Sequence, residues 1–174
     1  MKKNTKFLIP KVFGWQVISG TLQKNGFHDI NVMECSIDTY ETSDFKITAV
    51  PPLNVTGLEA QDENNMSIDG GFALINKSSG AKCVFLADDN LYSEKRVKEN
   101  LDVIADPDLI AFAYSGFASD YPFKYNMTKD EMIDICNRNE NERFATQVEN
   151  LRLIKPKFIL PYSSEFVAVG NHAQ

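Results

Sequence analysis

Short apolar runs typical of β-strands recur along the whole chain. Most contain β-branched or aromatic residues and end at turn residues, as in the run from Phe45 to Val50, which Pro51-Pro52 terminates. Two runs flank Lys77-Ser78-Ser79-Gly80 and predict a β-hairpin, because this short polar connection contains the glycine expected in a tight turn. The predicted strands cover residues 7–10, 30–35, 45–50, 71–76, 81–86, 109–114 and 157–161.

Three other segments carry apolar residues at helical spacing. Ser93 is suited to cap the second of them, and Thr128 with Glu131 forms a capping-box pattern at the start of the third. Within the third segment, the polar stretch 137–143 is either an exposed middle or a break. The predicted helices run from Trp15 to a stop at Asn25-Gly26, from Ser93 to Asp106-Pro107, and from Thr128 to Leu151.

Consecutive strands in the first half and alternating strands and helices in the second half predict the fold class. We expect a mixed α/β (α+β) protein in which helices flank a mixed β-sheet. Residues 54–69 are polar, show no clear period and predict a long surface loop. No internal repeat or low-complexity tract divides the chain, and its 174 residues fit a single domain over 1–174.

The charge balance argues against nucleic-acid binding. The formal net charge is -6, whereas affinity for a phosphate backbone depends on clustered Lys and Arg. The densest basic stretch, residues 95–98, lies between Glu94 and Glu99 and is expected to form a solvated helix face.

No apolar run reaches the length of a membrane span, so no membrane partner is expected. The three cysteines are widely spaced and include no CxxC pair, which favours reduced thiols and a cytoplasmic location.

The first candidate site is the pair Asp88 and Asp89, which follows the strand predicted over 81–86. Carboxylates at the carboxyl end of a strand are well placed for metal binding or acid–base chemistry, because open sheets hold their sites there. The alternative is structural: Asp and Asn also form turns and cap the next helix.

Two more candidates lie at the ends of predicted strands. The segment 114–123 combines small residues, hydroxyls and aromatics, and it either contacts a polar ligand or forms a loop over the core. Ser163 and Ser164 follow the last strand, where a hydrogen-bonding turn is favoured over a nucleophile. The substrate-binding candidates from these segments are Tyr114, Ser115, Ser119, Tyr121, Ser163 and Ser164.

The two histidines offer little chemistry. His28 is expected at the surface after a helix stop. His172 lies close to the carboxyl end, where chains usually fray, so a functional role is not favoured there. The sequence contains no HxH, HExxH, GxGxxG or GxxxxGK[ST] motif, so local motifs supply neither a complete zinc site nor a phosphate-binding loop.

Together, these segments resemble the later part of a metallo-β-lactamase-fold protein. The resemblance rests on the strand at 45–51, the hairpin that leads to Asp88, the Tyr114-Ser115-Gly116 loop with Tyr121-Pro122, and the closing run 154–161. It spans nearly all of the chain. The nearest branches are the ascorbate-phosphate lactonase-like hydrolases and the metallo-β-lactamase-like domain of the CMP-sialic acid hydroxylases.

The resemblance implies the second half of an αββα sandwich, whose other half carries an HxHxDH motif that this chain lacks. The family's bridging aspartate maps onto Asp88, or onto Asp89 if the register slips by one. Two further histidine ligands are missing: Pro51-Pro52 stands after the earlier strand, and Ser163 follows Pro161-Tyr162. Zinc, iron or manganese would therefore need ligands from outside this chain.

Three functions follow as hypotheses. The first is the C-terminal half of a metal-dependent hydrolase of an ester, lactone or phosphoester, inactive alone and paired with its missing N-terminal half or with further copies of itself. The second is a metal-free binding or assembly module with a degenerate fold of the same kind. The third and weakest is a serine-dependent hydrolase that uses Ser163 or Ser164 with His172.

Overall fold

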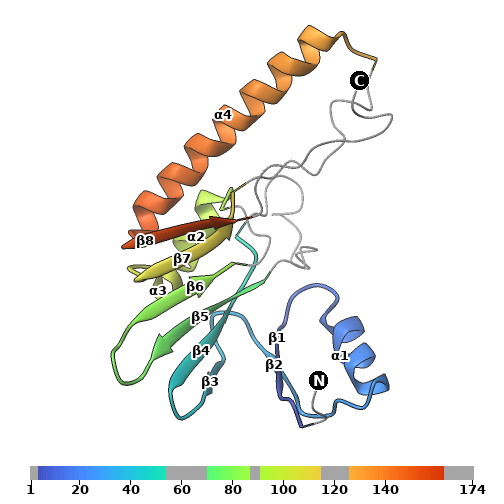
Figure 1. Cartoon of the computed structure of the whole chain (residues 1–174), viewed down its shortest axis with the longest axis vertical. Helices are drawn as coiled ribbons and strands as arrows, with labels where there is room; N and C mark the ends of the chain where they lie inside the picture. Colours follow the sequence, from blue (N-terminus) through green and yellow to red (C-terminus); the bar gives the residue numbers. More distant parts are fainter. Residues whose placement is uncertain (1–3, 54–69, 87–90, 115–125, 163–174) are drawn as a thin grey trace.

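A computed structural model describes residues 4–53, 70–86, 91–114 and 126–162. It contains a six-stranded sheet, a separate two-stranded sheet and four helices within these residues (Figure 1). No helix among them is long and apolar enough to cross a membrane. The elements are β1 (Phe7–Pro10), α1 (Trp15–Lys24), β2 (Ile30–Met33), β3 (Thr39–Glu41), β4 (Phe45–Val50), β5 (Gly71–Asn76), β6 (Lys82–Phe85), α2 (Glu94–Glu99), α3 (Leu101–Ile104), β7 (Leu109–Ala113), α4 (Lys129–Ile154) and β8 (Phe158–Tyr162).

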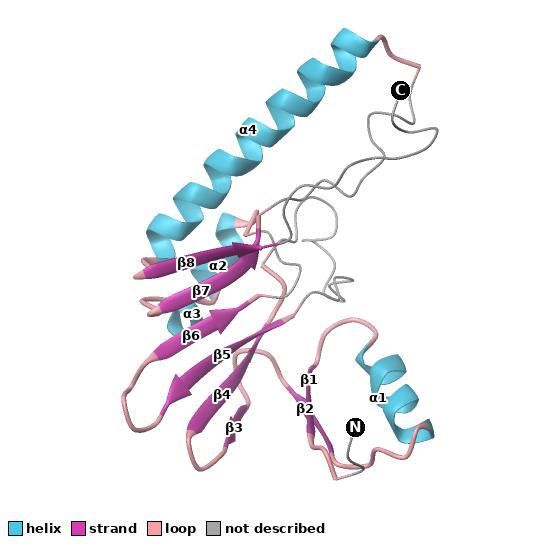
Figure 2. Cartoon of the chain, in the orientation of Figure 1, coloured by secondary structure: helices cyan, strands magenta, loops and turns pink. Residues whose placement is uncertain are grey.

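The large sheet has the order β3-β4-β5-β6-β7-β8. Its first four strands pair antiparallel, and β6, β7 and β8 pair parallel. The predicted mixed sheet with flanking helices is therefore confirmed. β1 and β2 instead pair parallel with each other in the small sheet beside α1, away from the helices α2, α3 and α4 (Figure 2).

Turn and cap chemistry explains where several elements begin and end. Gly80 adopts φ 72° in the β5–β6 hairpin, as its position in the sequence predicts. The Ser93 hydroxyl accepts a hydrogen bond from the Arg96 N–H at 3.3 Å. Thr128 and Glu131 form the predicted capping box at the start of α4.

The helices differ from the sequence prediction in two places. The predicted helix after Ser93 is broken at Asn100, which separates α2 from α3. The Asn100 side chain donates to the Arg96 carbonyl at 2.8 Å and accepts from the Ser36 hydroxyl at 2.6 Å, so a tertiary contact stabilises the break. α4, in contrast, continues without a break through the polar stretch 137–143, in which Asn137, Arg138, Asn141 and Glu142 are exposed.

The strand prediction missed one element and extended others. β3 was not predicted, because its three residues form a strand only by pairing with β4. β2 ends at Met33 instead of Cys35, and β8 is shifted one residue toward the carboxyl end. The short boundary differences reflect local pairing, which the apolar pattern alone does not resolve.

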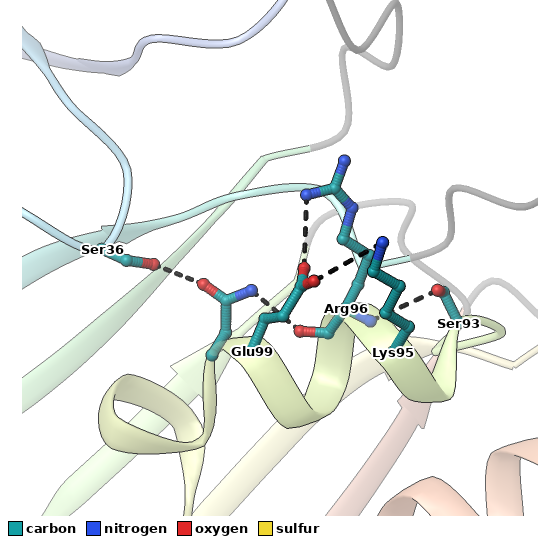
Figure 3. Close-up of polar contacts among 6 residues, drawn as sticks. Ser36, Ser93, Lys95, Arg96 and Glu99 are labelled. Atoms are coloured by element: carbon teal, nitrogen blue, oxygen red, sulfur yellow. Dashed lines mark hydrogen bonds and ion pairs between the residues drawn. The ribbon is translucent and has the colours of Figure 1, made fainter. Parts of the chain in front are cut away.

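The basic stretch 95–98 forms one solvated side of α2, as predicted, although Val97 between its charges is buried. Lys95 and Arg96 both reach Glu99, at 3.8 Å and 3.5 Å (Figure 3). Lys98 pairs with Glu94 at 2.5 Å. The three basic side chains thus pair with glutamates of the same helix, which agrees with the prediction of a solvated helix face.

One face of the large sheet packs against α2, α3 and α4. Side chains alternate between the two faces along each strand, and the pairing register assigns every strand residue of the core cluster to this face. The strand residues of the cluster are Val50, Ala73, Val84, Ile110 and Phe112, and Val97, Ile104 and Ile154 join them from the helices.

We call the opposite side the second sheet face. Its larger apolar side chains are Phe45, Ile47, Phe72, Leu74, Cys83, Phe85, Leu109, Phe158 and Leu160. None of these residues belongs to the helix-covered core cluster. Phe85, Leu160 and Phe158 are 42%, 51% and 69% exposed.

Candidate functional site at the carboxyl edge of the sheet

The strands β4, β6, β7 and β8 all run in the same direction, because β5 is antiparallel to both of its neighbours. Their carboxyl ends therefore meet at one side of the sheet, which we call the carboxyl edge. Its described residues are Leu53, Leu86, Leu91 to Ser93, Tyr114 and Tyr162. In open α/β sheets, ligands bind outside such ends.

Backbone hydrogen bonds join the strand ends at this edge. The Ser93 N–H donates to the Leu53 carbonyl at 3.0 Å, which ties the segment after β6 to the end of β4. The Leu86 N–H donates to the Ala111 carbonyl at 2.9 Å, and the Tyr114 N–H donates to the Tyr162 carbonyl at 3.1 Å. Backbone hydrogen bonds therefore link the ends of β4, β6, β7 and β8 or the residues that follow them.

Gly71 lets β5 approach β6 closely at this edge. A Cβ on Gly71 would lie 2.3 Å from the Phe85 carbonyl oxygen and 3.0 Å from Leu86 Cα. Both atoms are backbone and have no alternative rotamer. Only glycine therefore fits at the start of β5.

Tyr114 is the one predicted site residue within the described part of the chain. It directly follows β7 at the carboxyl edge, and its side chain is partly exposed. The other candidates lie outside the described residues: Asp88, Asp89, Ser115, Ser119, Tyr121, Ser163, Ser164 and His172. His28 follows α1 and is exposed, as expected.

The described neighbours of these candidates nevertheless share the carboxyl edge. Leu86 and Leu91 bound the four residues that include Asp88 and Asp89. Tyr114 precedes Ser115, and Tyr162 precedes Ser163. All three predicted features therefore follow neighbouring strands, β6, β7 and β8. The sequence related each feature to its own strand but did not show that these strands are neighbours.

The described residues do not fit a metal ion by themselves. They contain no group of three or more His, Cys, Asp or Glu side chains arranged to hold one. At the carboxyl edge they present leucine, serine and tyrosine, and the guanidinium of Arg143 lies 5.4 Å from the centre of the Tyr92 ring. A metal centre would need ligands from outside the described residues.

A carboxylate with a clearly shifted pKa lies at the opposite end of these strands. Asp108 accepts from the Lys157 ammonium at 2.6 Å and from the Lys82 N–H at 2.8 Å. These two bonds hold the pKa of Asp108 below its ordinary value, the Lys157 bond contributing most. Because Asp108 joins the starts of β6, β7 and β8, we interpret it as structural.

Two buried amides on α4 were missed by the sequence analysis. Gln147 and Asn150 are 3% and 0% exposed, and both donate hydrogen bonds to backbone carbonyls at the carboxyl edge. They share one helical stripe with Leu151 and Ile154. Two polar residues on an otherwise apolar helical stripe could have indicated these buried amides from the sequence.

No family model and no curated protein matches this chain. Solved structures do match its fold. A variant of the CmlA β-hydroxylase aligns with 90% of this chain and 31% of its own length, at 19% identity and a TM-score of 0.57. A candidate metal-dependent hydrolase from Parabacteroides distasonis aligns with 92% of this chain and 55% of its own length, at 18% identity and a TM-score of 0.53.

A possible metal-dependent hydrolase from Veillonella parvula aligns with 95% of this chain and 67% of its own length, at 11% identity and a TM-score of 0.52. The chain has part of a metallo-β-lactamase-like fold. It spans about a third and about half of the first two matched structures. Because these proteins include a hydroxylase as well as candidate hydrolases, the shared fold does not fix the reaction.

Proposed function

We propose that this chain is the C-terminal half of a metallo-β-lactamase-like, metal-dependent hydrolase of an ester, lactone or phosphoester, and that it is inactive alone. The observation that carries the proposal is the apolar second sheet face, which lies opposite the helix-covered core. The matched structures support it, because two of them are described as metal-dependent hydrolases and all three extend beyond the aligned part.

The second sheet face has the composition of an interior surface. The pairing register places no charged side chain of β4, β5, β6, β7 or β8 on it. Full burial of a large apolar side chain stabilises by about 1.5–3 kcal/mol, and Phe85, Phe158 and Leu160 each retain a large exposed fraction. A second sheet packed on this face would bury them, as in a two-sheet sandwich.

The outer strand β8 adds an apolar edge to this face. Its second neighbour is missing among the described strands, and Phe158, Ile159 and Leu160 are all about half exposed or more. Pro161 lies in the same strand, which agrees with an edge position. Unpaired apolar edges favour association with another chain.

The proposed partner is the missing N-terminal half, which would supply a second sheet and the remaining metal ligands. In the absence of that half, the same face would pair with a second copy of the chain. Asp88 or Asp89 would be the metal ligand from this half, and the segment from Tyr114 to Tyr121 with Ser163 and Ser164 would line the substrate cleft. The cytoplasm is the proposed location.

The interface is tested by light scattering of the purified full chain after size-exclusion chromatography. We expect the wild type to exceed its 19.6 kDa monomer mass and Leu160→Asp to return to that mass. Phe144→Asp is the matched control, because Phe144 is 62% exposed but lies on α4. A monomeric wild type across the micromolar range, or equal loss of association in both variants, would contradict the interface.

The metal and hydrolase assignments are tested on the same purified chain. Elemental analysis after dialysis against zinc, iron or manganese should find weak uptake that Asp88→Ala or Asp89→Ala lowers. Esterase and phosphodiesterase activity should stay at the level of a protein-free metal blank. A tightly bound stoichiometric metal with hydrolysis by the chain alone would overturn the half-enzyme proposal, and uptake that neither variant changes would remove both carboxylates from it.

A metal-free binding or assembly module is the second candidate. Association through the second sheet face combined with no metal uptake at all would select this module over the hydrolase.

A further inference from the structure

The small sheet β1–β2 lies against part of the second sheet face. Ala49 of β4 is fully buried on that face, although it does not belong to the helix-covered core cluster. A Cβ added to Gly70, the residue before β5, would lie 2.9 Å from Val12 Cγ1, just after β1. The Lys6 ammonium lies 5.4 Å from the centre of the Tyr40 ring, which β3 places on the same face. The small sheet therefore covers the second sheet face at β3 and β4 (Figure 1).

The helix α1 covers the other side of the small sheet. The Phe7 ring of β1 contacts the Phe27 ring, which follows α1, at a centroid distance of 5.3 Å. Successive side chains of a strand point to opposite faces, so Leu8 and Pro10 lie on the face away from Phe7. Pro10 Cβ lies 3.1 Å from the Cβ position of Gly70, so that face is turned toward the large sheet. Four layers are therefore stacked at this end of the molecule: α1, the small sheet, the large sheet and the helices of the core.

The cover on the second sheet face decreases along the strand order. Ala49 in β4 is fully buried and Phe72 in β5 is partly buried, whereas Phe85 in β6 is 42% exposed. In β8, Phe158 and Leu160 are 69% and 51% exposed. Contiguous exposed apolar surface marks an interaction site. The uncovered part of the face is thus the part formed by β5, β6, β7 and β8.

β1 presents an unpaired edge toward these uncovered strands. The chain passes from β2 directly into β3, whereas the segment after β1 meets Gly70 at the start of β5, so β1 is the inner strand of the small sheet. The Phe7 N–H donates to the Asp29 carbonyl at 2.9 Å, on the side of β2. Because the N–H groups of a strand alternate in direction, the N–H and carbonyl of Leu8 point away from β2.

β8 presents a similar edge in the large sheet. Its Phe158 N–H donates to the Asp108 carbonyl at 2.9 Å, so by the same alternation the N–H and carbonyl of Ile159 point away from β7. β8 has no second neighbour among the described strands, and Pro161 has no N–H to donate. Each sheet therefore has one short free edge beside the uncovered face, marked by Leu8 in β1 and by Ile159 in β8.

We propose that a second copy of this chain covers β5 to β8, and that the β8 edge of each copy lies beside the β1 edge of the other. A twofold axis between the two layers, parallel to the strands, brings the two uncovered faces together. It places β8 of the second copy next to β1, and β1 of the second copy next to β8. Both sheets then continue across the dimer, with the helices on the outside. This inference rests on the proposed function only in taking the second sheet face as an interface.

The shape and charge of the open surfaces favour a second copy as the occupant. A twofold interface joins one patch to itself, so the patch must be complementary to its own copy. The second sheet face meets this condition, because the register places no charged side chain of β4 to β8 on it and no like charges would meet. The two free edges also meet it, because one belongs to each sheet. A single symmetry operation thus covers the face and both edges.

Amide hydrogen exchange of the full chain, read by NMR, tests this arrangement at protein concentrations below and above the midpoint of dimer formation. We expect exchange at Leu8 and Ile159 to slow about tenfold or more in the dimer, because both N–H groups gain an acceptor. Val32 is the internal control. Its N–H points away from β1 by the same alternation, but it lies on the outer edge of the small sheet and should not change.

The possible results separate this inference from the proposed function. A dimer in which Leu8 and Ile159 exchange as fast as in the monomer would overturn the inference and leave the face interface standing. Equal slowing at Val32 would also overturn it, because association would then only stabilise the small sheet as a whole. A chain that stays monomeric across the micromolar range would overturn both the dimer and the face interface, in favour of a different occupant. None of these results depends on the metal or hydrolase assignment.

Proline substitution at the free edges gives a second test. Ile159→Pro removes the N–H of the β8 edge and keeps the apolar face intact. We expect its dimer dissociation constant to rise about tenfold or more, because the symmetric dimer loses the same hydrogen bond at both edges. Val32→Pro is the matched control and should leave the dissociation constant unchanged. Equal dissociation constants for Ile159→Pro and the wild type would refute pairing at the edges, and the exchange measurement on the wild type decides if a variant fails to fold.

Discussion

Gly71→Ala tests whether the carboxyl edge depends on close contact between β5 and β6. The added Cβ would lie 2.3 Å from the Phe85 carbonyl oxygen and 3.0 Å from Leu86 Cα. Ordinary van der Waals contact of an added Cβ lies at 3.4–4 Å, so the 2.3 Å distance to the carbonyl oxygen is short by about 1 Å. Because both contacted atoms are backbone, the two strands must separate.

The expected cost follows from this geometry. Overpacking a well-packed site costs typically about 1–3 kcal/mol, and the backbone contact places Gly71→Ala near the upper end of that range. For a chain of this size, each kcal/mol lowers Tm by about 2–4 °C. We therefore expect a Tm about 6–12 °C below that of the wild type.

Thermal unfolding followed by circular dichroism measures this change, at one fixed protein concentration because association shifts Tm. Gly20→Ala is the matched control, since nothing lies within 4 Å of its added Cβ and Gly20 lies within α1. Helix propensity predicts a gain of up to about 1 kcal/mol there. A Tm for Gly71→Ala within about 2 °C of the wild type, or an equal fall in Tm for the Gly20→Ala control, would refute the argument.

Two further predictions concern ionisable groups. The hydrogen bonds from Lys157 and Lys82 lower the pKa of Asp108 in the folded protein. These bonds therefore stabilise the folded protein fully above the ordinary pKa of 3.8, and the stabilisation is lost as the pH falls through the lower pKa of the folded state. Asp108→Asn should therefore reduce the drop in Tm between neutral pH and pH about 3, and an unchanged drop would contradict the assignment. Burial raises the pKa of the Cys35 thiol to about 11, which lowers the fraction of reactive thiolate. Iodoacetamide should therefore modify Cys35 at pH 8 about a hundredfold more slowly in the folded protein than in urea. Equal rates of modification would exclude that protection.

Local sequence signals located most elements because each acts over a few residues. The β-branched and aromatic residues of Phe45–Val50, with the stop at Pro51-Pro52, predicted β4 with its bounds, and Thr128 with Glu131 predicted the start of α4. β3 escaped because three residues have too little pattern without their pairing to β4. The break at Asn100 escaped for a similar reason, because its partner Ser36 lies far away in the sequence.

The candidate site divides in the same way. The sequence placed Asp88, Asp89 and Tyr114 at the carboxyl ends of predicted strands, although only Tyr114 lies within the described part of the chain. Gln147 and Asn150 appeared as ordinary polar helix residues, because helical periodicity does not reveal which backbone carbonyl a buried amide meets. Their hydrogen bonds arise from strands far away in the sequence.

The sequence by itself determined most of the strands, the caps of α2 and α4, the acidic balance and the absence of an HxHxDH motif. These properties depend on residue type and short spacing. Only the tertiary structure decided that β4, β6, β7 and β8 end at one edge, that β1 and β2 form a separate sheet, and that an apolar face lies opposite the helices. Strand order and the partner of each face are set by contacts between distant segments, and no local pattern encodes them.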